Sequence, residues 1–261
     1  MRNHDIIQVH RFGEWSYDKQ AFKRCEAVFV NGEGAIHHDC KLANFLLGVL
    51  KEGQRLKKKS LLVNCVFQDM SPHWGDVLKK LDYFSVREPL SAEHAKRCGG
   101  NPEVLLDSCA DPQFLNGKPI RQLSKIVVGD TLPSSPVGAE SPGGDVLSVF
   151  RYERFRLTCL FEDFVATLKT TKCYITGQHH GVYGAGLAGV PFVPLPSNTH
   201  KIESLIQWSG LPIKVCRTAK EVKEQIPYAL RNHHIYKAFH KFLLSKDIFD
   251  AAKADKILGK L

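Results

Sequence analysis

Residues Thr171 to Lys201 read TKCYITGQHHGVYGAGLAGVPFVPLPSNTHK, and this stretch decides the expected fold. An apolar run from Cys173 to Thr176 stops at Gly177, and a segment crowded with glycine and alanine follows. A second apolar run, residues 190–195, leads into a polar loop. The order predicts a strand, a closely packed helix and a second strand parallel to the first. In such a unit the helix N-terminus lies at the carboxyl edge of the sheet, where its N–H groups and dipole favour an anion.

Apolar runs alternate with helix-like patterns through most of the chain. The first, residues 27–30, ends in the glycine-rich sequence Asn31–Gly34, which predicts a turn, and helices are expected over residues 41–50 and 161–168. Strands separated by helices favour mostly parallel sheets, and 261 residues suit two domains. We therefore expect an α/β fold of two Rossmann-like lobes facing a cleft. The expected strands are residues 27–30, 60–66, 83–86, 104–106, 126–128, 146–150, 173–176, 190–195 and 213–216.

The boundary between the lobes is expected near residue 122, where the periodic pattern weakens. The N-terminal lobe then covers residues 1–122 and the C-terminal lobe covers residues 123–218, with a helical segment over 219–261. The loop at residues 131–144 is rich in proline, serine and glycine, and we expect it to be exposed and mobile.

Composition narrows the possible partners only partly. The net charge of +9 suits an acidic partner, whether nucleic acid, an anionic membrane surface or a phosphorylated substrate. No run of eighteen apolar residues and no signal-peptide pattern occurs, which predicts a soluble cytoplasmic protein. We expect no metal site, because the spacing of Asp69 and Asp107 matches no ligand pattern. The cysteines lack any C-x-x-C pair and are expected to be reduced core thiols; they are residues 25, 40, 65, 98, 109, 159, 173 and 216.

Three stretches together resemble the polysaccharide pyruvyl transferase family. They are Ala27–His37 (AVFVNGEGAIH), Phe84–Ala95 (FSVREPLSAEHA) and Tyr174–Glu203, within a resemblance that covers about residues 25 to 218. The resemblance implies a two-lobed, glycosyltransferase-B-like fold. It also implies transfer of an enolpyruvyl unit from phosphoenolpyruvate to sugar hydroxyls, commonly forming a cyclic ketal on a surface polysaccharide or its lipid-linked precursor.

The resemblance also assigns roles on the donor side, which it places in the C-terminal lobe. Members of the family carry an Arg-x-His-Gly type motif at the start of a helix, and His180 and Gly181 match it, whereas Gln178 stands at the arginine position. The arginine of a V-R-[DE]-x-x-S motif falls on Arg87. His180 is the expected acid, because imidazole titrates near neutral pH, and Arg87 is the second expected catalytic residue. Gln178 weakens the expected anion site, since an amide cannot replace a two-pronged guanidinium.

Further residues follow from their positions at strand ends. Asn198 and Lys201 lie in the loop after residues 190–195 and are expected to help bind the donor. Asn31, Glu33 and His37 are expected on the acceptor side, in the N-terminal lobe, where Glu33 can orient or deprotonate a sugar hydroxyl.

Simpler interpretations stay open for each of these residues. Arg87 can form an ordinary ion pair with Glu88 or Asp107, and Lys201 can be a solvated lysine at a helix start. His180 can pack at the start of its helix, and His179 is expected to pack or to face solvent.

The leading hypothesis is a transferase that moves a pyruvyl group from phosphoenolpyruvate to a saccharide. Phosphoenolpyruvate is its donor substrate and no separate cofactor is expected. The acceptor is a saccharide that can be lipid-linked at the inner membrane face, and nucleic acid is not an expected partner. Two alternatives remain: a glycosyltransferase-like enzyme that uses a nucleotide sugar, and a catalytically silent saccharide-binding homologue, which the exchange at Gln178 makes a real option.

Overall fold

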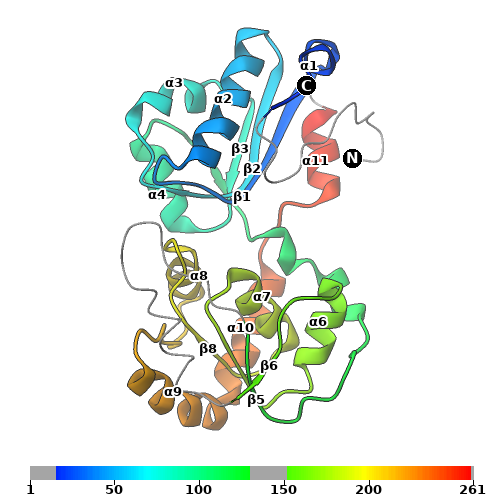
Figure 1. The fold of residues 1–261 in the computed structure, drawn as a ribbon, viewed down its shortest axis with the longest axis vertical. Coiled ribbons are helices and arrows are strands. Elements are labelled where there is room, and N and C mark those ends of the chain that lie inside the picture. Colours follow the sequence, from blue (N-terminus) through cyan, green and yellow to red (C-terminus); the bar gives the residue numbers. More distant parts are fainter. Residues whose placement is uncertain (1–15, 130–151, 260–261) are drawn as a thin grey trace. The chain divides into compact units, whose positions relative to one another are not determined.

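The chain divides into two units, each built on its own parallel sheet (Figure 1). The structure is a computed structural model that describes residues 16–129 and 152–259. Unit 1 comprises Met1–Ser108 with Asp247–Leu261, and unit 2 comprises Cys109–Lys246. The α/β class and the mostly parallel pairing expected from the sequence are confirmed in the described residues. The strand expected at residues 146–150 and the loop at 131–144 lie outside them.

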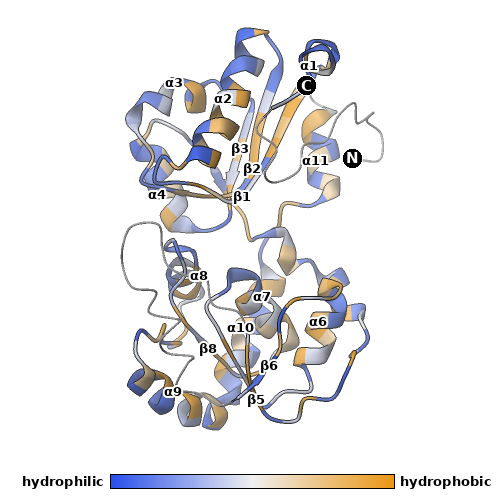
Figure 2. Ribbon diagram, in the orientation of Figure 1, coloured by the Kyte–Doolittle hydropathy of each residue, from blue (hydrophilic) through white to orange (hydrophobic). Residues whose placement is uncertain are grey.

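Unit 1 contains a four-stranded sheet in the order β1-β2-β3-β4, with every pair of neighbours parallel. Figure 2 shows apolar and polar residues alternating along α2, as expected for a helix with one buried face. The strands are β1 (Ala27–His37), β2 (Lys59–Gln68), β3 (Tyr83–Val86) and β4 (Glu103–Val104); the helices are α1 (Lys19–Arg24), α2 (Lys41–Arg55), α3 (Gly75–Lys79), α4 (Pro89–Arg97) and α11 (Ala251–Leu258).

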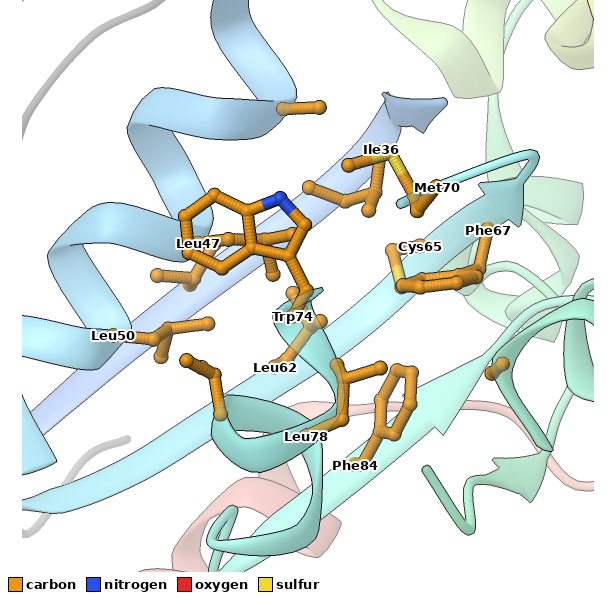
Figure 3. Packing of buried hydrophobic residues seen from close by; sticks show 14 of the residues in the cluster. Ile36, Leu47, Leu50, Leu62, Cys65, Phe67, Met70, Trp74, Leu78 and Phe84 are labelled. Atoms are coloured by element: carbon orange, nitrogen blue, oxygen red, sulfur yellow. The ribbon is translucent and has the colours of Figure 1, made fainter. Parts of the chain in front are cut away.

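Both faces of this sheet are covered by apolar side chains. On one face the strand residues Leu62 and Cys65 pack with Leu47 of α2 and Leu78 of α3 (Figure 3). On the other face Leu61 and Val63 join a second apolar cluster that includes residues of α11. Burial on both faces explains why β2 is apolar along most of its length instead of alternating.

The first strand is longer than the sequence predicts. Residues 31–34 were expected to form a turn, but β1 runs on to His37, with a register shift against β2 between Glu33 and Ile36. Glu33 has a φ of 44°, which marks the irregularity. Gly32 is required by packing, since a Cβ there would lie 2.4 Å from the Cβ of Cys65. The glycines therefore mark a bulged strand and not a turn.

Unit 2 contains a second four-stranded parallel sheet, in the order β6-β5-β7-β8. The expected strand at residues 213–216 is wrong: the N–H of Ile213 bonds locally to the Leu211 carbonyl, and only Cys216 reaches a strand residue, Pro194. The strands are β5 (Ile126–Val128), β6 (Glu153–Arg154), β7 (Cys173–Thr176) and β8 (Phe192–Pro194); the helices are α6 (Phe161–Leu168), α7 (His179–Ala188), α8 (Lys201–Ser209), α9 (Ala219–Arg231) and α10 (His233–Ser245).

The division between the units differs from the expected boundary at residue 122. Residues after 108 belong to unit 2 because they bond to α6: the N–H of Lys118 donates to Asp163 at 2.8 Å, and that of Ile120 donates to the Thr167 hydroxyl at 3.0 Å. Residues 219–261 do not form one segment, since α9 and α10 belong to unit 2 and α11 to unit 1.

The C-terminal segment joins unit 1 through backbone and ring contacts. The N–H of Leu106 donates to the Asp247 carbonyl at 2.8 Å. The ring of Phe249 lies 5.9 Å from that of Phe29 and 6.1 Å from that of Tyr83, measured between centroids. These contacts are long-range in the sequence, which is why local patterns did not reveal them.

Two further properties concern the whole described chain. All eight cysteines are free, and burial raises the pKa of the Cys173 and Cys216 thiols to about 12. Among the described helices, none combines the length and the apolar content that crossing a bilayer requires.

The docking of the C-terminal segment can be tested by shortening Phe249. Phe249→Ala removes a buried ring and should lower the free energy of unfolding of unit 1 by about 3 kcal/mol. Urea unfolding, combined with hydrogen exchange of β1 to β4, measures the effect. Leu244→Ala, at a side chain that is 39% exposed, should change stability by less than about 0.5 kcal/mol. Equal effects of the two substitutions would contradict the packing described.

Candidate functional site

In unit 2 the helix α7 begins directly at the carboxyl end of β7. The hydroxyl of Thr176, the last residue of β7, accepts the backbone N–H of Gln178 at 3.1 Å. A Cβ at Gly181 would lie 2.5 Å from the same hydroxyl oxygen, so a glycine at this position allows the helix to start this close to the strand. Gln178 is the N-cap residue, and its side chain does not cap the helix. The first N–H groups of α7 are therefore presented at the sheet edge by backbone packing.

The two histidines of α7 have different surroundings. His179 is buried, and its ring makes an edge-to-face contact with Tyr183 at a centroid distance of 4.9 Å. His179 was expected either to pack or to face solvent, and the structure shows it packed. His180 is half-buried in the first turn of the helix, with its ring 6.1 Å from that of His179. An ionisable side chain thus stands beside the anion-favouring end of α7.

The loop after β8 brings a lysine to the same edge. Thr176 and Pro194 are register partners, so the loops after β7 and β8 start side by side. Lys201, the first residue of α8, is only 5% exposed, and its ammonium donates to the Asn198 amide oxygen at 2.5 Å. The alternative of a solvated lysine is wrong. Lys201 and Asn198 are thus held together, and their part in donor binding stays a prediction.

In unit 1 the expected catalytic arginine is engaged by two carboxylates. Arg87 follows β3 directly and is 2% exposed. Its Nη1 lies 2.5 Å from Oδ2 of Asp107, which is fully buried, and 3.2 Å from Oε2 of Glu33. Arg87 therefore forms the ion pair with Asp107 that the simpler interpretation predicts. If both carboxylates are ionised, the trio carries one net negative charge, which does not by itself favour an anionic ligand.

The acceptor-side candidates are partly brought together. The Asn31 amide donates to Oε1 of Glu33 at 3.1 Å, so these two residues share one cluster. His37 lies four positions after Glu33, at the end of β1, where it pairs with Gln68 and its ring lies 5.2 Å from that of His38.

Sequence reasoning missed one residue of this cluster. Asn64 in β2 is buried, and its amide donates to Oε1 of Glu33 at 3.2 Å and to the Ser108 hydroxyl at 3.4 Å. The available signal was a single amide inside the otherwise apolar run of residues 61–67, because a buried polar side chain requires partners.

The residues next to Arg87 explain the rest of its motif. Glu88 is the N-cap of α4, and its carboxylate accepts the Ser91 N–H at 3.0 Å and the Ser91 hydroxyl. The Ser91 hydroxyl in turn accepts the N–H of Phe67 in β2 at 2.7 Å. All three are buried. Glu88 and Ser91 thus join α4 to the sheet, and their role in the motif is structural.

A family model gives these arrangements their context. The model described as polysaccharide pyruvyl transferase matches residues 3–199, which is three quarters of the chain. The chain belongs to the polysaccharide pyruvyl transferase family. The match includes β1, Arg87, the whole of α7 and Asn198, and it ends before Lys201. Pyruvyl transferases are enzymes that transfer a group to a saccharide, so a transferase with a saccharide acceptor is the activity that the family supports.

The chain is similar to several solved structures. A Listeria monocytogenes protein named as a putative UDP-N-acetylglucosamine 2-epimerase is similar with a TM-score of 0.53 and 11% identity, over 82% of this chain and 68% of that one. The rhamnosyltransferase SpnG with spinosyn aglycone gives a TM-score of 0.46 and 13% identity, over 78% and 69% of the two chains. The first of these likenesses shows the fold, which is the glycosyltransferase-B-like α/β fold expected for this pyruvyl transferase family member. No curated protein matches the chain.

The structural role of Glu88 predicts a loss of stability on substitution. Glu88→Ala removes the cap of α4 and leaves the buried Ser91 donors unsatisfied, which should lower the free energy of unfolding by about 2 kcal/mol. Glu93→Ala, at an exposed position of the same helix, is the matched control and should cost less than about 0.5 kcal/mol. Denaturant unfolding of the two variants measures the difference; similar losses would show that the Glu88 contacts contribute nothing.

Proposed function

We propose that this chain transfers a pyruvyl group from phosphoenolpyruvate to a saccharide hydroxyl, with unit 2 binding the donor and unit 1 the acceptor. The observation that carries the proposal is the buried Lys201, which Asn198 holds at the start of α8, after the strand β8 that pairs with β7. Phosphoenolpyruvate carries a carboxylate and a phosphate. The N-terminus of α7 with its backbone N–H groups and the Lys201 ammonium are the two features of this edge that suit such an anion.

In the proposal Lys201 also compensates for the missing arginine at position 178. An arginine at position 178 would supply a fixed positive charge, which glutamine lacks. In the proposal Lys201 supplies that charge from the neighbouring loop, while Gly181 and the first N–H groups of α7 contact the donor. Gln178 contributes a neutral hydrogen bond. The donor site then carries less positive charge than a site with both Lys201 and an arginine at position 178, but it is not neutral.

His180 is the proposed acid in the transfer step. Protonation of the methylene carbon of phosphoenolpyruvate by the imidazolium converts it to a methyl group and makes the adjacent carbon electrophilic. The oxygen of the saccharide hydroxyl bonds to that carbon, and its proton passes to the carboxylate of Glu33. The bond from that carbon to the phosphate oxygen then breaks, and phosphate leaves with the electron pair. A second hydroxyl of the same sugar can bond to the resulting cationic carbon and close a cyclic ketal, with its proton passing to the departing phosphate.

Unit 1 supplies the acceptor side in this proposal. Asn31, Glu33 and His37 are the proposed acceptor-binding residues, of which Asn31 and Glu33 are hydrogen-bonded to each other. Arg87 stays a proposed catalytic residue: one of its nitrogens orients Glu33, and a guanidinium has further N–H groups that can contact a carboxylate. A lipid-linked acceptor at the inner membrane face and a cytoplasmic location complete the proposal, which the positive net charge supports.

Calorimetry with phosphoenolpyruvate tests the donor assignment. The unaltered protein should bind it with a Kd below about one millimolar, as expected for a charged metabolite bound through several hydrogen bonds. Gln178→Arg should tighten binding by roughly tenfold, because a charge-assisted bond replaces a neutral one. Lys201→Met should weaken it by at least roughly tenfold for the converse reason. Absence of binding at millimolar concentration would overturn the proposal, and heat released with UDP-glucose instead would favour a nucleotide-sugar enzyme.

The acid assignment predicts a split between binding and turnover. His180→Ala should reduce phosphate release from phosphoenolpyruvate, in the presence of mixed methyl glycosides, by about 100- to 10,000-fold. Its affinity for phosphoenolpyruvate should change only a few-fold, since the helix N–H groups and Lys201 remain. His234→Ala, at an exposed histidine of α10, is the control and should behave as the unaltered protein. Full turnover by His180→Ala would show that another group delivers the proton.

A further inference from the structure

The strand β2 carries, level with the carboxyl ends of β3 and β4, a buried amide that the assigned motifs do not include. We propose that Asn64 is a positioning residue, which fixes the carboxylate of Glu33 so that it can accept a hydrogen bond and then a proton from a saccharide hydroxyl. The identity of that ligand as a saccharide rests on the proposed function. The fixed carboxylate itself rests only on the contacts within unit 1.

The backbone of Asn64 is held in an uncommon conformation. Its φ is 49°, in the left-handed region, and it lies where the pairing of β2 with β3 shifts register. Asparagine tolerates this region better than most residues with a side chain, so the residue type suits the backbone. The N–H of Asn64 donates to the hydroxyl of Ser85 at 3.3 Å, which ties the irregularity to the neighbouring strand.

The contacts of the side chain define which way its amide points. The N–H of Ser108 donates to Oδ1 of Asn64 at 3.4 Å, so the oxygen belongs on that side. Nδ2 then faces the carboxylate of Glu33 at 3.2 Å. The opposite orientation would place an amide oxygen against a carboxylate oxygen and an amide nitrogen against an N–H donor. At 2% exposure the side chain has little room for another rotamer.

The carboxylate of Glu33 is held at both of its oxygens. Oε1 accepts from Asn64 and from Asn31, and Oε2 accepts from Nη1 of Arg87. The side chain nevertheless stays 42% exposed. A carboxylate that is oriented by buried groups and open to solvent suits an external hydroxyl better than a purely structural role.

Arg87 does not depend on Glu33 alone for a carboxylate partner. Arg87 already has a fully buried partner in Asp107 at 2.5 Å, closer than Glu33 at 3.2 Å. The nearby thiol of Cys65 stays neutral, because burial raises its pKa far above the usual range. Of the two carboxylates that contact Arg87, that of Asp107 is fully buried and that of Glu33 is exposed.

The test combines a charge substitution with its partner. Asn64→Asp keeps the shape of the side chain and its tolerance of positive φ, but it sets a second carboxylate against Glu33. We expect the melting temperature to fall by several degrees and turnover to fall at least tenfold, measured as phosphate release with mixed methyl glycosides. The Kd for phosphoenolpyruvate should stay within twofold. Asn101→Asp, which adds the same charge at an exposed site in unit 1, should change neither quantity.

The double variant Asn64→Asp/Glu33→Gln separates positioning from stability. The amide introduced at position 33 can donate to the carboxylate introduced at position 64, so the melting temperature should return toward that of the unaltered protein. Turnover should not recover, because an amide accepts no proton. Failure to recover the melting temperature would overturn the contact. Recovery of both the melting temperature and turnover would show that Asn64 has only a structural role and would overturn the positioning role. If the unaltered protein neither binds phosphoenolpyruvate nor turns it over, the proposed function fails, and the melting temperatures still decide whether Asn64 fixes Glu33.

Discussion

The parallel alignment of β1 to β4 is the constraint on which the polar cluster of unit 1 depends. Parallel strands end at one edge, so residues distant in the sequence meet there. Glu33 comes from β1, Asn64 from β2, Arg87 follows β3 and Asp107 follows β4. Each contributes one group to the same set of hydrogen bonds. Removing Asp107, for example, leaves the buried Arg87 without its closest carboxylate, so chemistry and stability are coupled at this edge.

The motif around Arg87 shows how adjacent residues divide these tasks. Arg87 leaves the strand toward the polar cluster, whereas Glu88 and Ser91 bind each other and the backbone of β2 at Phe67. The cap of α4 therefore fixes the backbone from which Arg87 projects. A family motif read only as a catalytic signature would assign chemistry to Glu88, although its buried contacts serve the fold.

The sequence predicted elements whose signals are local and missed those that depend on distant contacts. The bounds expected for β3, β5, β7 and α6 agree with the structure, because each is an apolar run ended by polar or glycine residues. Asn31–Gly34 resembled a turn, but Gly32 is set by the approach of Cys65 from β2. Asn64 carried no local signal beyond its polarity. The return of α11 to unit 1 depends on Phe249 meeting Phe29, which no periodicity contains.

In the proposed donor site of unit 2, as in the polar cluster of unit 1, a charged group comes from the segment that follows a neighbouring strand. In our proposal the donor site has a glutamine instead of an arginine at position 178, and the ammonium of Lys201 supplies the positive charge. Lys201 lies just beyond the segment matched by the family model. A lysine offers one compact charge and cannot grip a carboxylate with two parallel bonds. Orientation of the donor then falls to the N–H groups of α7, whose positions are set by the contact of Gly181 with Thr176. A rigid backbone can hold an anion in one orientation without a guanidinium, so the glutamine changes how the donor is recognised more than whether an anion is favoured.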